Sequence, residues 1–419
     1  MKIALVIEHF DAARGGAEHF AVWLAGQLVS RGHDVHVVCH DSHRRRDRYQ
    51  AAHRGASHDA VKSATAGGIK TAAVPGVTIH PIGAVKLSTG IGFRQFGRGV
   101  HQWCREQKPD LVHSISVAFP GDIYHPQPGV YMRMQRQAIE LRDHSAAANL
   151  KRLTLGLSSK QRALLALERA ACGPVNRGGA KKLICISNLV RRDFADYYHV
   201  PPGRLLQLEN PMMCKIPSQQ QMAQDRDWFR GMYQLAPDAR VAAFAGHDFR
   251  RKGLAWAIRA VAATADWQLV VVGMGKVRRY LELAENLGIS PRVKFIGPTR
   301  EMAKIYAAGD ALLFPTFYDS FGLVALEAMV NGLDVISTRF LGAADLVEDL
   351  GMGVIVDSPR SVAEMAAALS SLTPDWRTRT ARAAAAAQRL DSLTPAAYMQ
   401  RLEAAYQDVL SARGQHRLV

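Results

Sequence analysis

Two carboxylates stand eight positions apart in the second half of the chain, at Asp319 and Glu327. Asp319 lies in the loop YDSFG, directly after the apolar run ALLFPT, which is typical of a buried strand. Glu327 lies in LVALEAM, which predicts a helix whose first turn has free backbone N–H groups. Such amides attract phosphate and carboxylates accept hydrogen bonds from sugar hydroxyls, so the pattern predicts a site for an anion or a polyhydroxylated ligand. The alternative is that Asp319 caps the helix and Glu327 is a solvated helix residue.

Two adjacent cations, Arg251 and Lys252, form a second candidate group. They follow the strand pattern VAAFAG and precede the helix pattern LAWAIRAVAA. The start of a helix favours anions, so cations at this position indicate a choice made for a ligand. Fixed positive groups at this position could stabilise negative charge on a ligand where no metal does so. A helix cap or a surface pair is the alternative reading.

The acidic pair resembles a known nucleotide-sugar motif. The sequence reads D-x7-E followed by AMVNGLDV, and it is similar to the E-x7-E and A-x-x-x-G-x-P-V of retaining GT-B glycosyltransferases of the family 4 type, related to bacterial lipopolysaccharide core glucosyltransferases. Asp319 replaces the usual first glutamate, and Asp334 replaces the common proline. Arg251-Lys252-Gly253 matches the family's R-K-G, and the GGAE at Gly15 and Gly16 resembles its N-terminal loop.

The resemblance implies roles for individual residues. Arg251, Lys252 and Asp319 are expected in catalysis, together with Asp122 and His125 of DIYHPQPGVY, where a histidine satisfied by a turn is the alternative. Glu327 is expected on the ribose hydroxyls. The predicted donor-binding residues are Gly15, Gly16, Gly246, Gly273, Gly275, Ile296, Phe321, Gly322, Leu323 and Glu327.

The chain offers no sequence signal for a metal. No D-x-D follows a strand in a suitable setting, and no His, Cys and carboxylate cluster has metal-ligand spacing. We therefore expect transfer without a metal or cofactor, with a nucleotide sugar as the substrate and UDP as the product.

Length and periodicity predict the architecture. A chain of 419 residues is too long for one ordinary core, and strand patterns alternate with helical ones throughout. The sequence predicts two α/β, Rossmann-like, doubly wound domains facing a central cleft, which the resemblance identifies as GT-B. We expect an acceptor-side domain over 1–208, a nucleotide-sugar domain over 209–393, and a last helix, about 394–419, packed back on the first domain. Residues 42–73, rich in Arg, His, Ala, Ser and Gly, are expected to form a mobile loop or insertion.

The amino-acid composition indicates the class of protein and the compartment in which it works. The 48% hydrophobic and 21% charged content excludes a largely disordered chain, and no run of about 18 apolar residues would span a membrane. MKIALVIEHF resembles a first strand rather than a signal peptide. Five cysteines without a C-x-x-C pair favour a reducing cytoplasm.

The net charge of +16 is concentrated in the first half. Residues 1–208 hold 29 Lys and Arg against 15 Asp and Glu, a net of +14, and residues 209–419 hold 24 against 22, a net of +2. This asymmetry favours a polyanionic partner, and a basic proteome or a solubility effect is the alternative. Basic and apolar residues mixed between Met132 and Arg169 predict a peripheral contact with the anionic inner face of the cytoplasmic membrane, or else a helical hairpin with a basic outer face.

The sequence thus predicts a retaining, metal-independent hexosyltransferase. The expected reaction moves a hexose, most readily glucose from UDP-glucose, to a cell-envelope glycan or glycolipid such as lipopolysaccharide core. One alternative is a mannosyl- or glycosyltransferase acting on a phospholipid or a polyprenyl-linked acceptor. Another is a non-catalytic, basic nucleic-acid-binding protein, which is disfavoured because no aromatic residues interleave with the cations of Arg133–Arg169. The sequence leaves the oligomeric state open.

Overall fold

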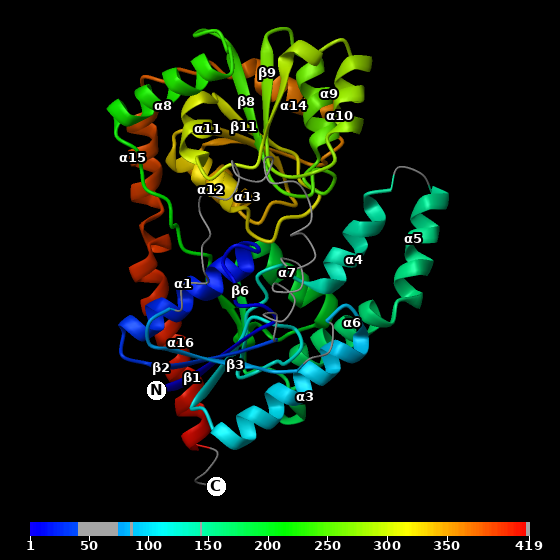
Figure 1. The fold of residues 1–419 in the computed structure, drawn as a ribbon, viewed down its shortest axis with the longest axis vertical. Helices are drawn as coiled ribbons and strands as arrows, with labels where there is room; N and C mark the ends of the chain where they lie inside the picture. The colour runs from blue at the N-terminus through cyan, green and yellow to red at the C-terminus, as the bar shows by residue number, and fades with distance from the viewer. Residues whose placement is uncertain (41–73, 84–86, 143–144, 416–419) are drawn as a thin grey trace, which may run out of the picture.

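The computed structural model describes residues 1–40, 74–83, 87–142 and 145–415. The predicted insertion over 42–73 lies outside the described residues. Two α/β domains stand one above the other, and the long C-terminal helix runs beside the lower one (Figure 1).

The N-terminal domain is built on a seven-stranded parallel sheet with the strand order β3-β2-β1-β4-β5-β6-β7. Its strands are β1 (Lys2–Ile7), β2 (Asp34–Cys39), β3 (Val77–Pro81), β4 (Leu111–Ser114), β5 (Ile123–Tyr124), β6 (Lys182–Cys185) and β7 (Leu205–Gln207). Its helices are α1 (Gly16–Ser30), α3 (Gly90–Gln107), α4 (Tyr131–Glu140), α5 (Ser145–Leu157), α6 (Ser159–Cys172) and α7 (Asn188–Tyr198), with short 3-10 turns at Val175–Arg177 and Pro202–Arg204.

The C-terminal domain repeats this plan with a six-stranded parallel sheet, ordered β10-β9-β8-β11-β12-β13. Its strands are β8 (Arg240–Ala245), β9 (Trp267–Val272), β10 (Val293–Gly297), β11 (Ala311–Phe314), β12 (Asp334–Thr338) and β13 (Gly353–Val356). Its helices are α8 (Gln219–Met232), α9 (Leu254–Ala262), α10 (Arg278–Asn286), α11 (Met302–Ala308), α12 (Leu323–Val330), α13 (Ala344–Leu350), α14 (Val362–Ser371) and α15 (Arg379–Arg389), with 3-10 turns at Ser290–Arg292 and Asp391–Leu393.

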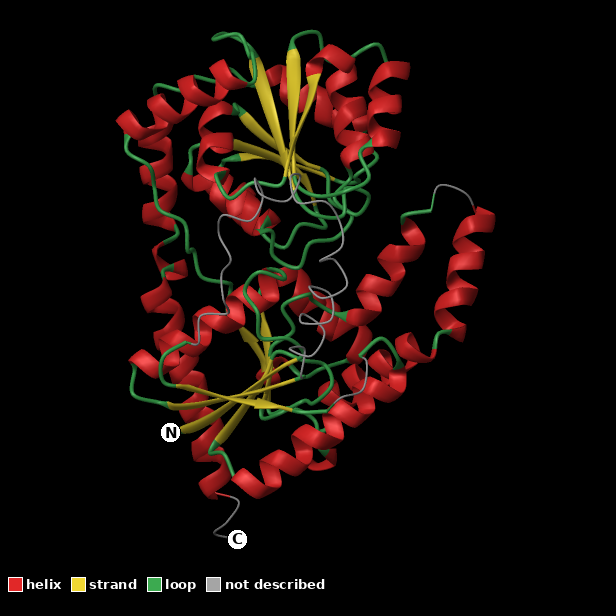
Figure 2. Cartoon of the chain, viewed as in Figure 1, coloured by secondary structure: helices red, strands yellow, loops and turns green. Residues whose placement is uncertain are grey.

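Helices cover both faces of each sheet (Figure 2). The central strands are therefore buried on both sides, which explains why they are near-continuous apolar runs instead of alternating patterns. The doubly wound α/β fold predicted from the sequence is confirmed.

The last helix, α16 (Pro395–Gln415), returns to the N-terminal domain. The Tyr406 hydroxyl lies 2.7 Å from His113 Nδ1 of β4, and Glu403 Oε1 lies 3.3 Å from His33 Nε2. The Tyr398 ring meets Phe20 of α1 edge to face, with 5.9 Å between centroids. The two domains are thus joined by packing as well as by the chain crossing near residue 210.

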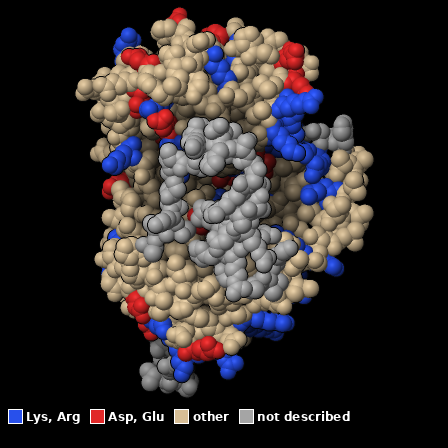
Figure 3. Space-filling view, viewed as in Figure 1, with Lys and Arg blue, Asp and Glu red and all other residues tan. Residues whose placement is uncertain are grey.

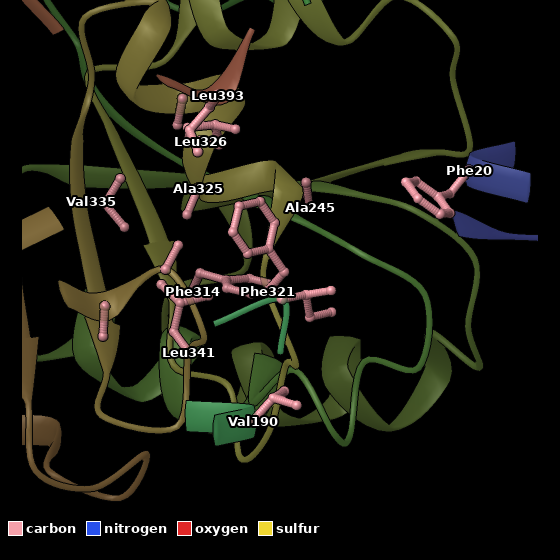
Figure 4. Close-up of a cluster of buried hydrophobic side chains, with 14 of the residues drawn as sticks. Phe20, Val190, Ala245, Phe314, Phe321, Ala325, Leu326, Val335, Leu341 and Leu393 are labelled. Atoms are coloured by element: carbon pink, nitrogen blue, oxygen red, sulfur yellow. The ribbon is translucent and has the colours of Figure 1, made fainter. Parts of the chain in front are cut away.

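Apolar packing fixes the loop that follows β11. Phe314, Phe321 and Leu341 are almost fully buried and lie against Ala325 of α12 (Figure 4). Burial of each large side chain stabilises the fold by roughly 1.5–3 kcal/mol. Asp319 lies between two such anchors in the sequence, so its position depends on the core.

The carboxyl ends of the two sheets face one another. The Ser187 hydroxyl, just after β6, donates to the carbonyl of Ser320, after β11, at 2.7 Å. We call this contact between the loops that follow the carboxyl ends of the two sheets the seam. In open parallel sheets, ligands bind beyond the carboxyl ends of the strands, so a site is expected at the seam.

Candidate functional site

The loops after β8 and β11 bring Lys252 and Asp319 together. These strands are neighbours in the sheet, so their carboxyl ends lie side by side. Lys252 Nζ donates to Asp319 Oδ2 in a short ion pair. The ammonium also lies 5.1 Å from the centroid of the Phe314 ring. Two residues 67 positions apart thus form one charged unit at the domain seam.

The ion pair is largely shielded from water, since the side chains of Lys252 and Asp319 are 9% and 19% exposed. Burial lowers the pKa of Lys252, and the pair with Asp319 opposes this. Burial alone would raise the pKa of Asp319, but the charge and hydrogen bond of Lys252, with help from Arg251, lower it. The carboxylate is therefore held ionised in a site where fixed charges act strongly.

Arg251 lies beside this pair on the same loop. Its carbonyl accepts a hydrogen bond from the Phe317 N–H at 2.9 Å, which ties the β8 loop to the β11 loop. Its Nε lies 3.7 Å from Asp248 Oδ2. Gly253 has a φ of 80°, and a Cβ there would overlap the carbonyl of Pro315, so the contact between the loops requires glycine.

The start of α12 lies next to Asp319. The Phe321 N–H donates to Asp319 Oδ1 at 3.3 Å, so the carboxylate also meets the backbone ahead of the helix. Gly322 has a φ of 90°, and a Cβ at this position would overlap Leu341. Phe321 is buried, and Leu323 opens the helix with its side chain partly buried. These three predicted donor-binding residues therefore shape the turn that presents the α12 amides.

Glu327 follows one turn later and is positioned by a buried tyrosine. The Tyr306 hydroxyl donates to Glu327 Oε2 at 2.7 Å. Burial raises the pKa of Glu327, an effect that the tyrosine hydrogen bond counteracts. Glu327 is therefore a fixed acceptor on the helix that begins beside Asp319.

The predicted glycines after β8 and β9 pack closely. A Cβ on Gly273 would overlap the carbonyl of Gly246, and a Cβ on Gly275 would lie 2.5 Å from the Phe249 ring. These positions let the loops of neighbouring strands touch. Ile296 lies in β10 and lines a cavity of about 130 Å³ with Trp228 and Lys304, on the side of α8.

In the N-terminal domain, Gly15 and Gly16 form the start of α1, after β1. A Cβ on Gly16 would meet no described atom within 4 Å, whereas one on Gly15 would lie 3.1 Å from Glu18 Oε2. They present backbone at the carboxyl edge of the N-terminal sheet, as expected from their place in the strand-loop-helix order.

The structure does not bring Asp122 to the site. Asp122 precedes β5, and its Oδ2 accepts from the Val112 N–H at 2.9 Å, while its Oδ1 lies 3.4 Å from Lys181 Nζ. Its carbonyl accepts from the backbone of Lys181 and Lys182. These contacts hold the amino ends of β4, β5 and β6, which point away from the seam. The catalytic assignment of Asp122 is therefore corrected to a structural one.

His125 lies at the carboxyl end of β5 but is fully buried. Its Nδ1 lies 3.1 Å from His113 Nε2, and its Nε2 accepts from the Gln127 amide at 2.9 Å. Burial, followed by the charge of His113, lowers the pKa of His125 well below its ordinary value, which favours the neutral ring. Direct contact between this imidazole and a substrate would require Gln127 to move.

Sequence reasoning missed the residues that join the domains. The Ser320 hydroxyl donates to the Gln127 carbonyl at 2.7 Å, and the Tyr318 hydroxyl lies 3.2 Å from Asp193 Oδ2. Gln127 in turn exchanges hydrogen bonds with Asn210 at 3.0 and 2.9 Å. Tyr318 and Ser320 flank Asp319, and this position in the motif could have indicated that they contact the other domain. Nothing in the sequence pattern marked Gln127.

Glu8, directly after β1, is a second partly buried carboxylate at the seam. The Ser116 hydroxyl donates to Glu8 Oε1 at 2.7 Å. Burial raises the pKa of Glu8, although this hydrogen bond works in the opposite direction. Among the described residues, no group of three or more His, Cys, Asp and Glu side chains could hold a metal ion.

Both halves match transferase family models. A model described as "Glycosyltransferase Family 4" matches residues 14–211, and one described as "Glycosyl transferases group 1" matches residues 225–389.

Two curated proteins resemble parts of the chain. The lipopolysaccharide glucosyltransferase WaaG of Escherichia coli (strain K12) is 30% identical over 210 residues, which are 49% of this chain and 55% of that protein. A D-inositol 3-phosphate glycosyltransferase of Corynebacterium diphtheriae is 34% identical over 182 residues, 40% of this chain and 42% of that protein. The matched stretches thus span about half the length of these relatives.

Solved structures show the same fold over nearly the whole length. A crystal structure of WaaG has a TM-score of 0.69 at 23% identity and covers 96% of this chain and 98% of that one. The structure of Anabaena Alr3699/HepE in complex with UDP-glucose has a TM-score of 0.65 at 17% identity and covers 97% and 100%. With a family 4 domain followed by a group 1 domain in the GT-B arrangement, the chain belongs to the GT-B glycosyltransferases, as the sequence predicted.

Proposed function

We propose that the chain is a retaining, metal-independent hexosyltransferase that moves glucose from UDP-glucose to a cell-envelope glycan or glycolipid. The observation that carries this proposal is the shielded pair of Lys252 and Asp319, with Arg251 beside it, at the start of α12 and at the domain seam. The names of similar proteins add support, since one is a lipopolysaccharide glucosyltransferase and another was solved with UDP-glucose.

The cations act on the leaving diphosphate. Negative charge grows on the diphosphate as the glycosidic bond breaks, and preorganised positive groups stabilise that charge without reorganising. The Lys252 ammonium is already oriented by Asp319, and the backbone of Arg251 is anchored beside it through its carbonyl. The amides at the start of α12 add the positive end of a helix.

Asp319 and Glu327 bind the sugar and the ribose. Both carboxylates accept hydrogen bonds from hydroxyl groups, and both are held by a protein partner, Lys252 in one case and Tyr306 in the other. Asp319 is one methylene shorter than glutamate, so the donor hexose must come closer to the loop, and the choice of sugar depends on this distance.

The stereochemical part of the proposal is retention. Acceptor attack on the face from which the diphosphate leaves gives a product with the configuration of the α-configured donor. Proton NMR of the fresh product tests this, because the anomeric coupling distinguishes the two configurations. An α-linked product is expected, and a β-linked product would contradict retention.

The acceptor is proposed to be reached at a membrane. On α5, Leu150, Leu153 and Leu157 are 63%, 59% and 69% exposed, and no α5 side chain is buried. Their spacing puts them on one side of the helix, next to Lys151 and Arg152. An exposed apolar face bordered by cations suits the surface of an anionic leaflet. No helix in the described part of the chain is long and apolar enough to cross a membrane. We place the protein peripherally on the inner face of the cytoplasmic membrane.

The exposed apolar face of α5 also suits a second class of acceptor. A phospholipid or a polyprenyl-linked oligosaccharide would present its reacting hydroxyl at the same surface. An acceptor panel with purified protein and UDP-glucose separates the candidates. Transfer to core oligosaccharide and none to lipid-linked acceptors is the expected result, and the reverse result would favour the second class.

A further inference from the structure

A pocket lined by arginines lies beside the catalytic loops, on the outer side of the seam. It encloses about 540 Å³ between α9, α10 and the end of α4. Small-molecule sites in proteins commonly measure roughly 300–1,000 Å³. Its cationic lining residues are Arg250, Arg259, Arg279 and Arg360. In Figure 3, Lys and Arg side chains gather at the right edge of the molecule, where the upper domain approaches the α4–α5 hairpin.

The described lining residues of the pocket include four arginines and no acidic side chain. Asp248, whose charge reaches Tyr280, faces Arg251 at 3.7 Å. Glu140 is paired with Arg133 at 3.0 Å. Asp248 and Glu140 thus each have a cationic partner outside the pocket lining.

Aromatic rings lie against three of the guanidinium groups. The Arg259 and Arg360 guanidinium carbons lie 5.7 and 5.6 Å from the centroid of the Trp256 ring, and that of Arg279 lies 4.6 Å from Tyr280. A stacked guanidinium keeps its charge and its in-plane donors. The forked donor geometry of arginine matches the oxygens of a phosphate.

Both domains contribute to this pocket. Arg250 and Arg360 donate to the carbonyls of Leu141 and Glu140, at the carboxyl end of α4, at 2.8 and 2.9 Å. Cations are favourable at this end of a helix. These contacts join the C-terminal domain to the hairpin and form the inner wall of the pocket. Arg259 and Arg279 are exposed and form its outer part.

The pocket is distinct from the donor site, although the same loops build both. Arg250 and Phe317 line the pocket, whereas their near neighbours Lys252 and Asp319 form the shielded ion pair. Neither Lys252 nor Asp319 is among the residues that line the pocket.

We propose that this arginine pocket binds a phosphate-bearing group, carried either by a sugar or by a lipid headgroup. Binding needs no sugar nucleotide and does not depend on the proposed transfer reaction. Because the ligand would contact α4 and the C-terminal domain together, it would also stabilise the observed arrangement of the domains.

The test is a calorimetric titration of the full chain with glucose 6-phosphate, and in parallel sedimentation with phosphatidylcholine vesicles with and without phosphatidic acid. The variant carries Arg259→Gln and Arg279→Gln, which removes the two exposed cations. The matched control carries Arg278→Gln and Arg300→Gln, which removes two exposed cations outside the pocket. Arg251→Gln is titrated as well, to exclude phosphate binding in the donor site.

At least a tenfold loss of affinity is expected in the pocket variant, for one or both probes, with little change in the control and in Arg251→Gln. Loss with glucose 6-phosphate identifies a sugar phosphate, and loss with phosphatidic acid vesicles alone identifies a lipid phosphate. The proposal is overturned if wild-type protein binds neither probe, if the control loses as much as the pocket variant, or if only Arg251→Gln loses binding.

Discussion

Each of the two domains is built on its own parallel sheet, but the side chains that they place at the seam differ in chemistry. The C-terminal domain brings charges, Lys252 and Asp319, which are ion-paired and shielded. The N-terminal domain brings His125 and Gln127 in a buried network that reaches Tyr406 of α16 through His113. Burial lowers the pKa of His113 to about 3, so the network is neutral at physiological pH.

Under the proposed function, the two sides suit separate tasks. Charge is costly to bury and is kept where a charged ligand offsets the cost, so the C-terminal side suits a leaving diphosphate. Neutral groups that already hydrogen-bond to one another hold the side chains of the network in fixed positions. The N-terminal side therefore suits the orientation of an acceptor and the joining of α16 to the seam.

The largest expected effect comes from the charged pair. Lys252→Met or Asp319→Asn leaves one shielded charge unpaired, which costs about 3–5 kcal/mol of folding free energy when a pair is fully buried, and less with these partly exposed side chains. Turnover should fall by roughly 10²–10³ because transition-state stabilisation is lost. Thermal unfolding and steady-state kinetics measure the two effects.

The double variant Lys252→Met, Asp319→Asn is the control that separates stability from function. It removes both charges, so it should recover much of the lost stability while turnover remains low. Recovery of turnover together with stability would mean that the pair only supports the fold.

Glu327→Ala should have the next largest effect. Loss of charge-assisted hydrogen bonds to ribose costs roughly 1.5–3 kcal/mol, so the affinity for UDP should fall by about ten- to a hundredfold. Tyr306→Phe keeps the carboxylate and removes only its orienting hydroxyl, so a smaller loss is expected. Calorimetry that finds wild-type affinity for UDP in Glu327→Ala would exclude Glu327 from the site.

The α5 face should produce a several-fold effect on membrane binding. Changing Leu150, Leu153 and Leu157 to Ser removes three exposed apolar side chains whose partial burial in lipid would favour binding. Sedimentation with phosphatidylglycerol vesicles should decrease, and wild-type binding should weaken with salt. Ile91→Ser, at a residue that is 65% exposed on α3, serves as the control. Equal loss in the control, or equal wild-type binding to neutral vesicles, would contradict an anionic contact through α5.

The smallest expected effect concerns pH and the contact between Tyr318 and Asp193. Burial raises the pKa of Asp193 to about 7, above its unfolded value, so the folded state binds this proton more tightly. The contribution to stability is therefore full below the unfolded pKa and is lost as pH rises through about 7.

Asp193→Asn resembles the protonated state at every pH. Its melting temperature should therefore rise relative to wild type between pH 5 and pH 8, whereas the exposed Asp196→Asn control should show no such trend. If the difference in melting temperature between Asp193→Asn and wild type stays constant with pH, Asp193 does not titrate in this range.

Sequence predicted the fold and family well because the information is local. The runs ALLFPT, VAAFAG and QLVVVGMG are buried on both faces and form β11, β8 and β9. The spacing between Asp319 and Glu327 spans one loop and about one helical turn, so a short stretch of chain places both carboxylates.

The N-terminal side was harder to predict because its contacts are distant in sequence. His113 contacts Tyr406, which lies 293 residues later, and no local pattern indicates this pairing. β5 has only two residues, so its limits could not be located from periodicity, and the sequence did not show that Asp122 lies at its amino end. The arginine pocket joins α9 and α10 to the end of α4, which lies more than 100 residues earlier in the sequence.

The affinities for UDP and for uridine, measured by calorimetry in wild type and in Arg251→Gln, test the central claim most directly. If the C-terminal charges meet the diphosphate, wild-type protein should bind UDP at least about 100-fold more tightly than uridine, since several charge-assisted hydrogen bonds are added. Arg251→Gln should reduce that ratio about tenfold and leave the affinity for uridine unchanged. Equal affinities for UDP and uridine in wild type, or a ratio that the variant leaves intact, would contradict the assignment.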